Sequence, residues 1–179
     1  MATMEETQAF ENRILERLNT RQTVKGLLQA AIPLLAEAID RLVLQAFRKD
    51  DYAVKYAVEP LLEGDGPLAA LPMRLKLIYA LGAISRTEYE DIELLLALHN
   101  QLALDSQTYR FTDDEVLGPL SMLHGMRHLP PAPTLHLPED VVDSRLVDMQ
   151  QQRYQQMVRS TLVLSITEML ASLAHKKAF

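Results

Sequence analysis

Apolar residues recur every three or four positions along most of the chain, which is the spacing that one face of an α-helix requires. The clearest stripe runs through residues 24–46, at Val24, Leu28, Ala31, Leu35, Ala38, Leu42 and Ala46. No segment shows the sustained alternation of apolar and polar residues that predicts a half-buried strand. The pattern therefore predicts an all-α fold.

Interruptions of this spacing divide the chain into seven expected helices. Pro33 is expected to kink the second helix, and Pro60 to end the third, because proline lacks an amide donor and clashes one turn back. Three capping boxes are expected to start helices: Thr3 with Glu6, Ser85 with Glu88, and Thr112 with Glu115. The expected ranges are 4–18, 20–48, 52–58, 72–81, 86–104, 113–126 and 143–174.

The segment 128–138 contains four prolines and is predicted to be an extended connector. We therefore expect one helical domain over residues 1–179: a multi-helix bundle with this connector and a long C-terminal helix. Residues 162–173 of that helix are apolar on nearly every side. A helix of this kind is buried either at the centre of a bundle or in a subunit interface, so a homodimer is one expectation.

Composition narrows the class of protein. The chain has 179 residues, 48% of them apolar and 23% charged, and no cysteine, which predicts a folded protein without disulfides or cysteine zinc sites. The polar, acidic start lacks the order of a secretory signal. The apolar stretch 27–47 carries Glu37, Asp40 and Arg41 near its middle, so we expect a core helix and no membrane span. A cytoplasmic location follows as the expectation.

The negative charge is regional. Residues 86–115 contain eight acids and two arginines, which accounts for the whole net charge of −6. Carboxylates in the first turns of a helix favour the positive end of its dipole, and that explains them as stabilising residues. They are also a candidate surface for a basic partner. The candidate residues of this acidic face are Glu88, Glu90, Asp91 and Glu93.

No arrangement of residues predicts catalysis. His99 lies on an apolar stripe and is expected to be a packed, hydrogen-bonded side chain. His124 and His128 have the four-residue spacing of zinc ligands, but no third ligand is indicated. The chain lacks nucleophile motifs and phosphate-binding glycine loops. We predict no catalytic residues, no metal site, no cofactor and no enzyme activity.

Residues 72–104 have the outline of a helix-turn-helix, but four acids oppose Arg86 in the first turns of the second helix. Such a helix would be repelled by DNA phosphates, so direct DNA binding through it is doubtful. An alternative is a dimer that contacts an operator through its paired C-terminal helices. The basic residues available there are Arg153, Arg159, Lys176 and Lys177.

Four runs of sequence together resemble the mannitol operon repressor family of enteric bacteria. They are FRKDDYAVKYAVEPLLEGDGPL (47–68), RLKLIYALGAISRTEYEDIELLLAL (74–98), YRFTDDEVLGPL (109–120) and QRYQQMVRSTLVLSITEML (152–170). The resemblance implies an all-helical negative regulator of mannitol uptake and breakdown. Together with the missing basic helix, it leads us to expect regulation mainly through protein contacts. The expected partner is a component of the sugar phosphotransferase system or the transcription machinery.

Overall fold

The computed structural model describes residues 3–47, 51–133 and 144–176. Every regular element within these ranges is helical, which confirms the all-α prediction. The elements are α1 (Met4–Asn19), α2 (Val24–Ala46), α3 (Val54–Leu62), α4 (Leu71–Ala80), α5 (Arg86–Leu102), α6 (Asp114–Ser121), the short 3-10 helix η1 (His124–Met126) and α7 (Ser144–His175).

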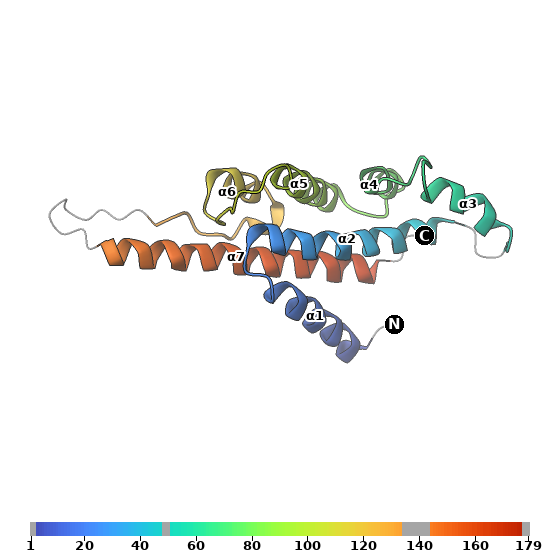
Figure 1. Ribbon diagram of the computed structural model, residues 1–179. Coiled ribbons are helices and arrows are strands. Elements are labelled where there is room, and N and C mark those ends of the chain that lie inside the picture. Colours follow the sequence, from blue (N-terminus) through green and yellow to red (C-terminus); the bar gives the residue numbers. More distant parts are fainter. Residues whose placement is uncertain (1–2, 48–50, 134–143, 177–179) are drawn as a thin grey trace.

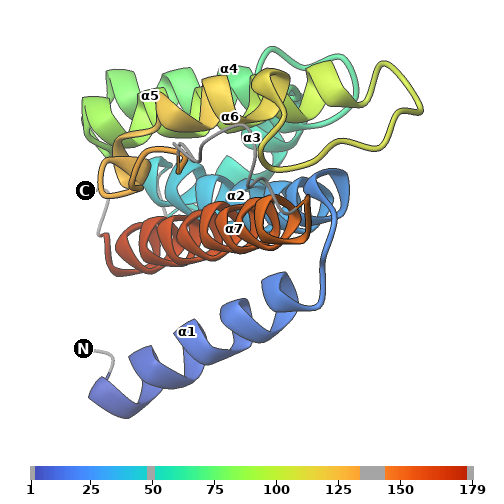
Figure 2. The same cartoon turned by 90° about the vertical axis from the view of Figure 1, so that its left-hand side faces the viewer.

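The helices form layers around a central pair. Helices α2 and α7 lie side by side, with α4, α5 and α6 covering one side of the pair (Figure 1). Helix α1 lies on the opposite side, at an angle to the pair (Figure 2). Helix α3 extends beyond the C-terminal end of α2 and has no buried residue. The two longest helices, α2 and α7, therefore lie at the centre.

The stripe predicted on α2 forms one side of the core. Five of its seven positions are buried, while Ala38 and Ala46 lie half-buried at its margin. Leu27, Ile39 and Val43 are buried beside them. Burying a leucine or isoleucine side chain contributes about 1.5–3 kcal/mol, so this face is a principal source of stability.

Helix α7 confirms that the apolar segment 162–173 is buried within the bundle. Leu162, Ile166, Leu170 and Leu173 are each at most 2% exposed, whereas Leu164 is 53% exposed. By length and composition α7 is also apolar enough to cross a membrane. However, 61% of its apolar window is buried within the fold, as in the core helix of a soluble protein.

Two of the three predicted capping boxes are confirmed, at Thr3 with Glu6 and at Ser85 with Glu88. The third is wrong. Helix α6 is capped at Asp113, whose side chain makes no cap bond to the helix. The Asp113 carboxylate instead accepts a hydrogen bond from the Arg110 backbone amide at 2.8 Å, which closes the preceding turn.

Three predicted helix ends differ from the structure by more than two residues. Thr20 closes α1, so α2 begins only after Thr23, whose hydroxyl accepts from the Gly26 amide at 3.0 Å. Pro60 lies inside α3, a helix with no buried residue, so water can hydrate the carbonyl that loses its partner. The predicted sixth helix stops at Ser121, for a reason given below. Residues 128–133 are non-helical as predicted, and residues 134–138 of the connector lie outside the described ranges.

Arg74 holds the turn before α4 against the bundle. Its guanidinium donates to the carbonyl oxygens of Leu68 at 2.6 Å, Leu62 at 3.1 Å and Ala69 at 3.2 Å, and it pairs with Asp40 on α2. The planar, five-donor shape of arginine suits this convergent set of acceptors. One side chain therefore fixes a turn that has little apolar burial of its own.

Candidate partner-binding surface

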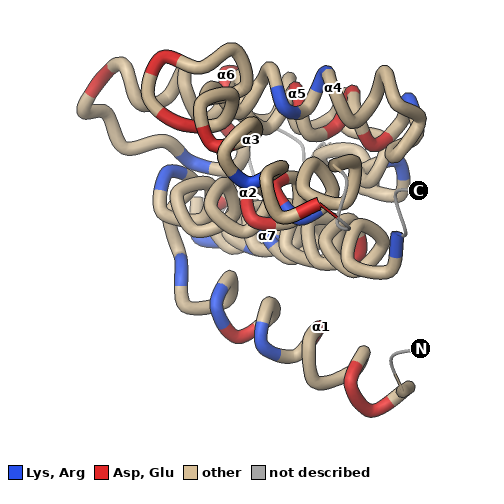
Figure 3. Tube along the Cα trace, turned by 90° about the vertical axis from the view of Figure 1, so that its right-hand side faces the viewer, with Lys and Arg blue, Asp and Glu red and all other residues tan. Residues whose placement is uncertain are grey.

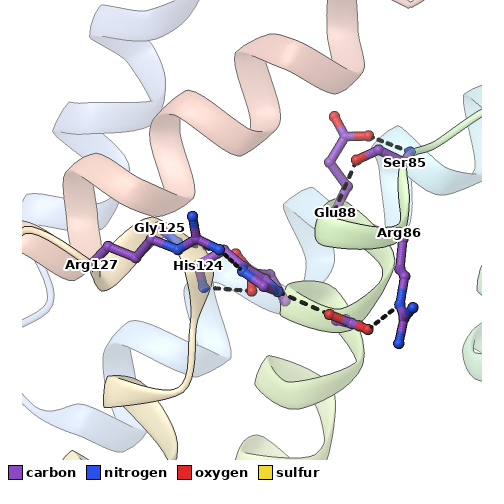
Figure 4. A network of polar contacts seen from close by, with 8 residues as sticks. Ser85, Arg86, Glu88, His124, Gly125 and Arg127 are labelled. Carbon is purple, nitrogen blue, oxygen red and sulfur yellow. Dashed lines mark hydrogen bonds and ion pairs between the residues drawn. The ribbon is translucent and has the colours of Figure 1, made fainter.

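The acidic face begins at the capped start of α5, where Glu88 is bound rather than free (Figure 4). Its carboxylate accepts from the Ser85 amide at 2.8 Å, pairs with Lys176 at 2.7 Å and accepts from the Ser172 hydroxyl at 2.9 Å. Burial, the largest single influence, raises the pKa of Glu88, but these hydrogen bonds together outweigh it and leave the pKa below its ordinary value. Glu88 therefore ties α5 to the end of α7.

Glu90 is the centre of a chain of polar contacts on the surface. It accepts from Arg86 Nε at 2.7 Å and contacts His124 Nε2 at 2.9 Å. Because Arg127 Nη2 lies 2.7 Å from His124 Nδ1 and can only donate, His124 carries its proton on Nε2 and donates it to Glu90. The hydrogen bonds from His124 and Arg86 hold the pKa of Glu90 below its ordinary value. Glu90 stays ionised, with 39% of its side chain exposed.

Asp91 lies beneath this surface rather than on it. Its side chain is 4% exposed, and its two oxygens accept from the backbone amides of His124 at 2.8 Å and Gly125 at 3.2 Å. These amides would otherwise continue α6, so Asp91 is the reason that the predicted sixth helix gives way to η1. Its carboxylate has a structural role and is not available to a partner.

Glu93 is exposed one turn further along α5. It accepts from the Tyr89 hydroxyl at 3.1 Å, and the Tyr89 ring stacks on Tyr79 of α4 with centroids 4.5 Å apart. The face therefore combines two carboxylates, Glu90 and Glu93, with an aromatic pair. Aromatic side chains are enriched at protein interfaces and polar groups surround them at the rim, so this surface is compatible with a partner contact.

The residues of the DNA-binding alternative do not form one surface. Arg159 is 7% exposed and donates to the backbone carbonyls of Asn19 and Arg21 at 2.9–3.0 Å. Lys176 is paired with Glu88, Arg153 is exposed, and Lys177 lies outside the described residues. Basic and acidic residues are also mixed along the C-terminal half of α1 (Figure 3). This placement does not favour a phosphate-binding surface.

The histidines take structural positions. His99 is half-buried and its Nδ1 lies 3.3 Å from Asn100 Oδ1, as expected for a packed histidine. His128 is exposed after η1, whereas His124 is held by Glu90 and Arg127. Within the described ranges, no group of three or more acidic or histidine side chains could hold a metal ion.

Sequence reasoning missed the close approach of η1 to α7. A Cβ on Gly125 would lie 1.9 Å from Ser165 Oγ, so only glycine fits there without a shift. The sequence did contain a signal for this contact, because a glycine such as Gly125 in an otherwise helical pattern often has a packing reason. This contact sets the position of His124 and thereby the geometry around Glu90.

This chain is similar to known proteins over nearly its whole length. Residues 10–174 match the family described as mannitol repressor. The mannitol operon repressor of Escherichia coli (strain K12) is 61% identical, over 99% of this chain and 89% of that protein. Fumarase E of the same strain is 27% identical, over 91% of this chain and 96% of that protein.

Solved structures show the same fold. The X-ray structure of the MtlR–HPr complex from Escherichia coli superposes with a TM-score of 0.85 at 60% identity, over 93% of this chain and 99% of that one. A possible transcriptional regulator, YggD from Shigella flexneri, superposes with a TM-score of 0.71 at 27% identity, over 91% of this chain and 97% of that one. The matched residues, the identity and the shared fold together show that this chain belongs to the mannitol repressor family.

Proposed function

We propose that this protein represses the mannitol operon mainly through protein contacts, and that HPr, a component of the sugar phosphotransferase system, is one partner. The observation that carries the proposal is the 60% identity to a chain whose structure was solved as a complex with HPr. At this identity, and with a TM-score of 0.85, the surfaces of the two chains have the same backbone framework.

The acidic face supports a contact with a basic surface. Glu90 and Glu93 are accessible, and Glu90 is held in place by Arg86 and His124, so little side-chain entropy is lost when it binds. We assign these two residues to the partner interface. Glu88 and Asp91, which were predicted with them, support the interface from below by fixing α5 to α7 and η1.

The experiment is calorimetric titration of the protein with HPr at two salt concentrations. We expect the double reversal Glu90→Lys with Glu93→Lys to weaken binding at least tenfold and to reduce its salt dependence, because rim charges steer association. Glu16→Lys, an exposed acid on α1, is the matched control and should change neither quantity. Unchanged affinity and salt dependence in the double variant would place the contact elsewhere.

A regulator of an operon and a component of the sugar phosphotransferase system meet in the cytoplasm, and we propose that location. We also propose that the chain has no enzyme activity, which is consistent with the regulator names of its relatives. Because one relative is named fumarase E, hydration of fumarate is the reaction to assay. Turnover above the uncatalysed rate would overturn this part of the proposal.

A further inference from the structure

A polar cleft lies between the turn that precedes α6, residues 132–133 and the N-terminal half of α7. Figure 1 shows this part of the fold, with α6 above the N-terminal half of α7. Its volume is about 650 Å³, and a second hollow of about 410 Å³ adjoins it. Arg110, Thr112 and Gln151 line both hollows and so lie between them. Such volumes are within the range of small-molecule sites.

The lining offers both hydrogen-bond donors and acceptors. Asp113 and Asp114 come from the α6 side, and Asp148 and Gln151 from α7. Tyr154 closes the inner wall; its hydroxyl donates to the Pro130 carbonyl at 3.0 Å, so its ring is a fixed apolar surface. Carboxylates accept, amides do both, and the Arg110 guanidinium donates. A hydroxyl group both donates and accepts, so a polyhydroxylated ligand matches this mixture.

Two residues that line the second hollow have unused bonding capacity. Gln155 Oε1 is buried without a hydrogen-bond partner among the described residues. Among the residues that the structure describes, the Arg110 guanidinium has no hydrogen-bond or ion-pair partner, although its backbone amide is bound to Asp113. A buried acceptor without a partner destabilises the fold, and a rotation of the Gln155 side chain that turned Oε1 into the hollow would let it accept a hydrogen bond from a ligand hydroxyl.

We propose that this cleft binds a neutral polyol. The charge of the lining decides between a polyol and its phosphate ester, because three carboxylates face one guanidinium. A phosphate dianion would meet net repulsion, whereas a neutral chain of hydroxyls would not. The polyol class rests on the lining alone; only the choice of mannitol as a probe rests on the proposed function.

The test is calorimetric titration of the full chain with D-mannitol and, separately, with mannitol 1-phosphate, both at millimolar concentrations. Gln155→Met removes the buried acceptor while keeping the side-chain length, and Gln156→Met is the matched control at an exposed position outside the lining. We expect mannitol to bind the wild type and the control equally, and the Gln155→Met variant about tenfold more weakly or worse. Its unfolding midpoint should equal or exceed that of the wild type, because an unpartnered buried acceptor is gone.

Three results would overturn the proposal: no saturable binding of mannitol, tighter binding of the phosphate ester, or equal effects of the two glutamine variants. None of them bears on HPr binding, which is measured separately. Failure of the polyol site and failure of the proposed function are therefore distinguishable.

Discussion

Replacing Asp91 by asparagine tests whether the acidic face consists of exposed carboxylates that are supported by a buried one. In the structure both Asp91 oxygens accept from backbone amides, at 2.8 Å from His124 and 3.2 Å from Gly125. Asparagine keeps one acceptor and turns an NH₂ group toward the other amide. Losing a hydrogen bond to a charged group costs about 1.5–3 kcal/mol, and a buried unpaired donor costs about 1–3 kcal/mol.

Taking the lower half of each range, we expect Asp91→Asn to lower the free energy of unfolding by about 3 kcal/mol. That is a large share of the ~5–15 kcal/mol that holds a domain folded. It corresponds to a fall in Tm of about 6–12 °C for a chain of this length. Urea unfolding followed by circular dichroism measures the change, and an unchanged slope with denaturant would show that the unfolded state is unaffected.

Glu93→Gln is the matched control, because it also removes one negative charge, but from an exposed side chain that lies two residues after Asp91. We expect its effect to stay within about 0.5 kcal/mol, as for most surface substitutions. If Asp91→Asn also stayed within that margin, or if Glu93→Gln cost as much, the division of the acids into a buried support and an exposed face would be refuted.

The remaining predictions concern other parts of the fold. Arg74→Met should lower the free energy of unfolding by about 3 kcal/mol, because it leaves three carbonyls and one carboxylate without their partner. Arg86→Met is the control, because 80% of the Arg86 side chain is exposed, and it should leave the free energy of unfolding almost unchanged; urea unfolding measures both. Since folding depresses the pKa of Glu88, this carboxylate stabilises the folded state above its ordinary pKa of 4.5, and that stabilisation is lost as the pH falls below 4.5. Glu88→Gln should therefore flatten the dependence of the free energy of unfolding on pH in that range, and an unchanged dependence would contradict this. The hydrogen bond to Asp105 raises the pKa of Tyr109 to about 12, so Asp105→Asn should bring it toward the ordinary value of 10; ultraviolet titration with Tyr109→Phe as reference decides.

Local features were predictable because their physical causes are local. The boxes at Thr3 and Ser85 join residues three positions apart, and the α2 stripe repeats at helical spacing. The box at Thr112 failed because the Asp113 carboxylate bonds backward to Arg110 instead of forward into the helix. The neighbouring residues Thr112 and Asp113 could each have capped the start of α6, and spacing alone does not decide between them.

The candidate site was predictable only in part. The sequence indicated where the acids lie. All four belong to the same two turns, however, and distinguishing the buried ones from the exposed ones required knowing what packs on α5. Asp91 is bound by a backbone amide 33 residues away, and Glu88 by a hydroxyl 84 residues away. No local pattern reports such contacts. The polar cleft was missed for the same reason, since its walls are distant in sequence.

The most direct test of repression through protein contacts is a titration of the purified protein with a mannitol-operon promoter fragment, beside a scrambled fragment, at physiological salt. With Arg159 buried, Lys176 paired and the carboxylates of Glu90 and Glu93 accessible, we predict no preference between the two fragments. Tighter binding to the promoter than to the scrambled fragment would show that the protein reads DNA directly and would contradict the account.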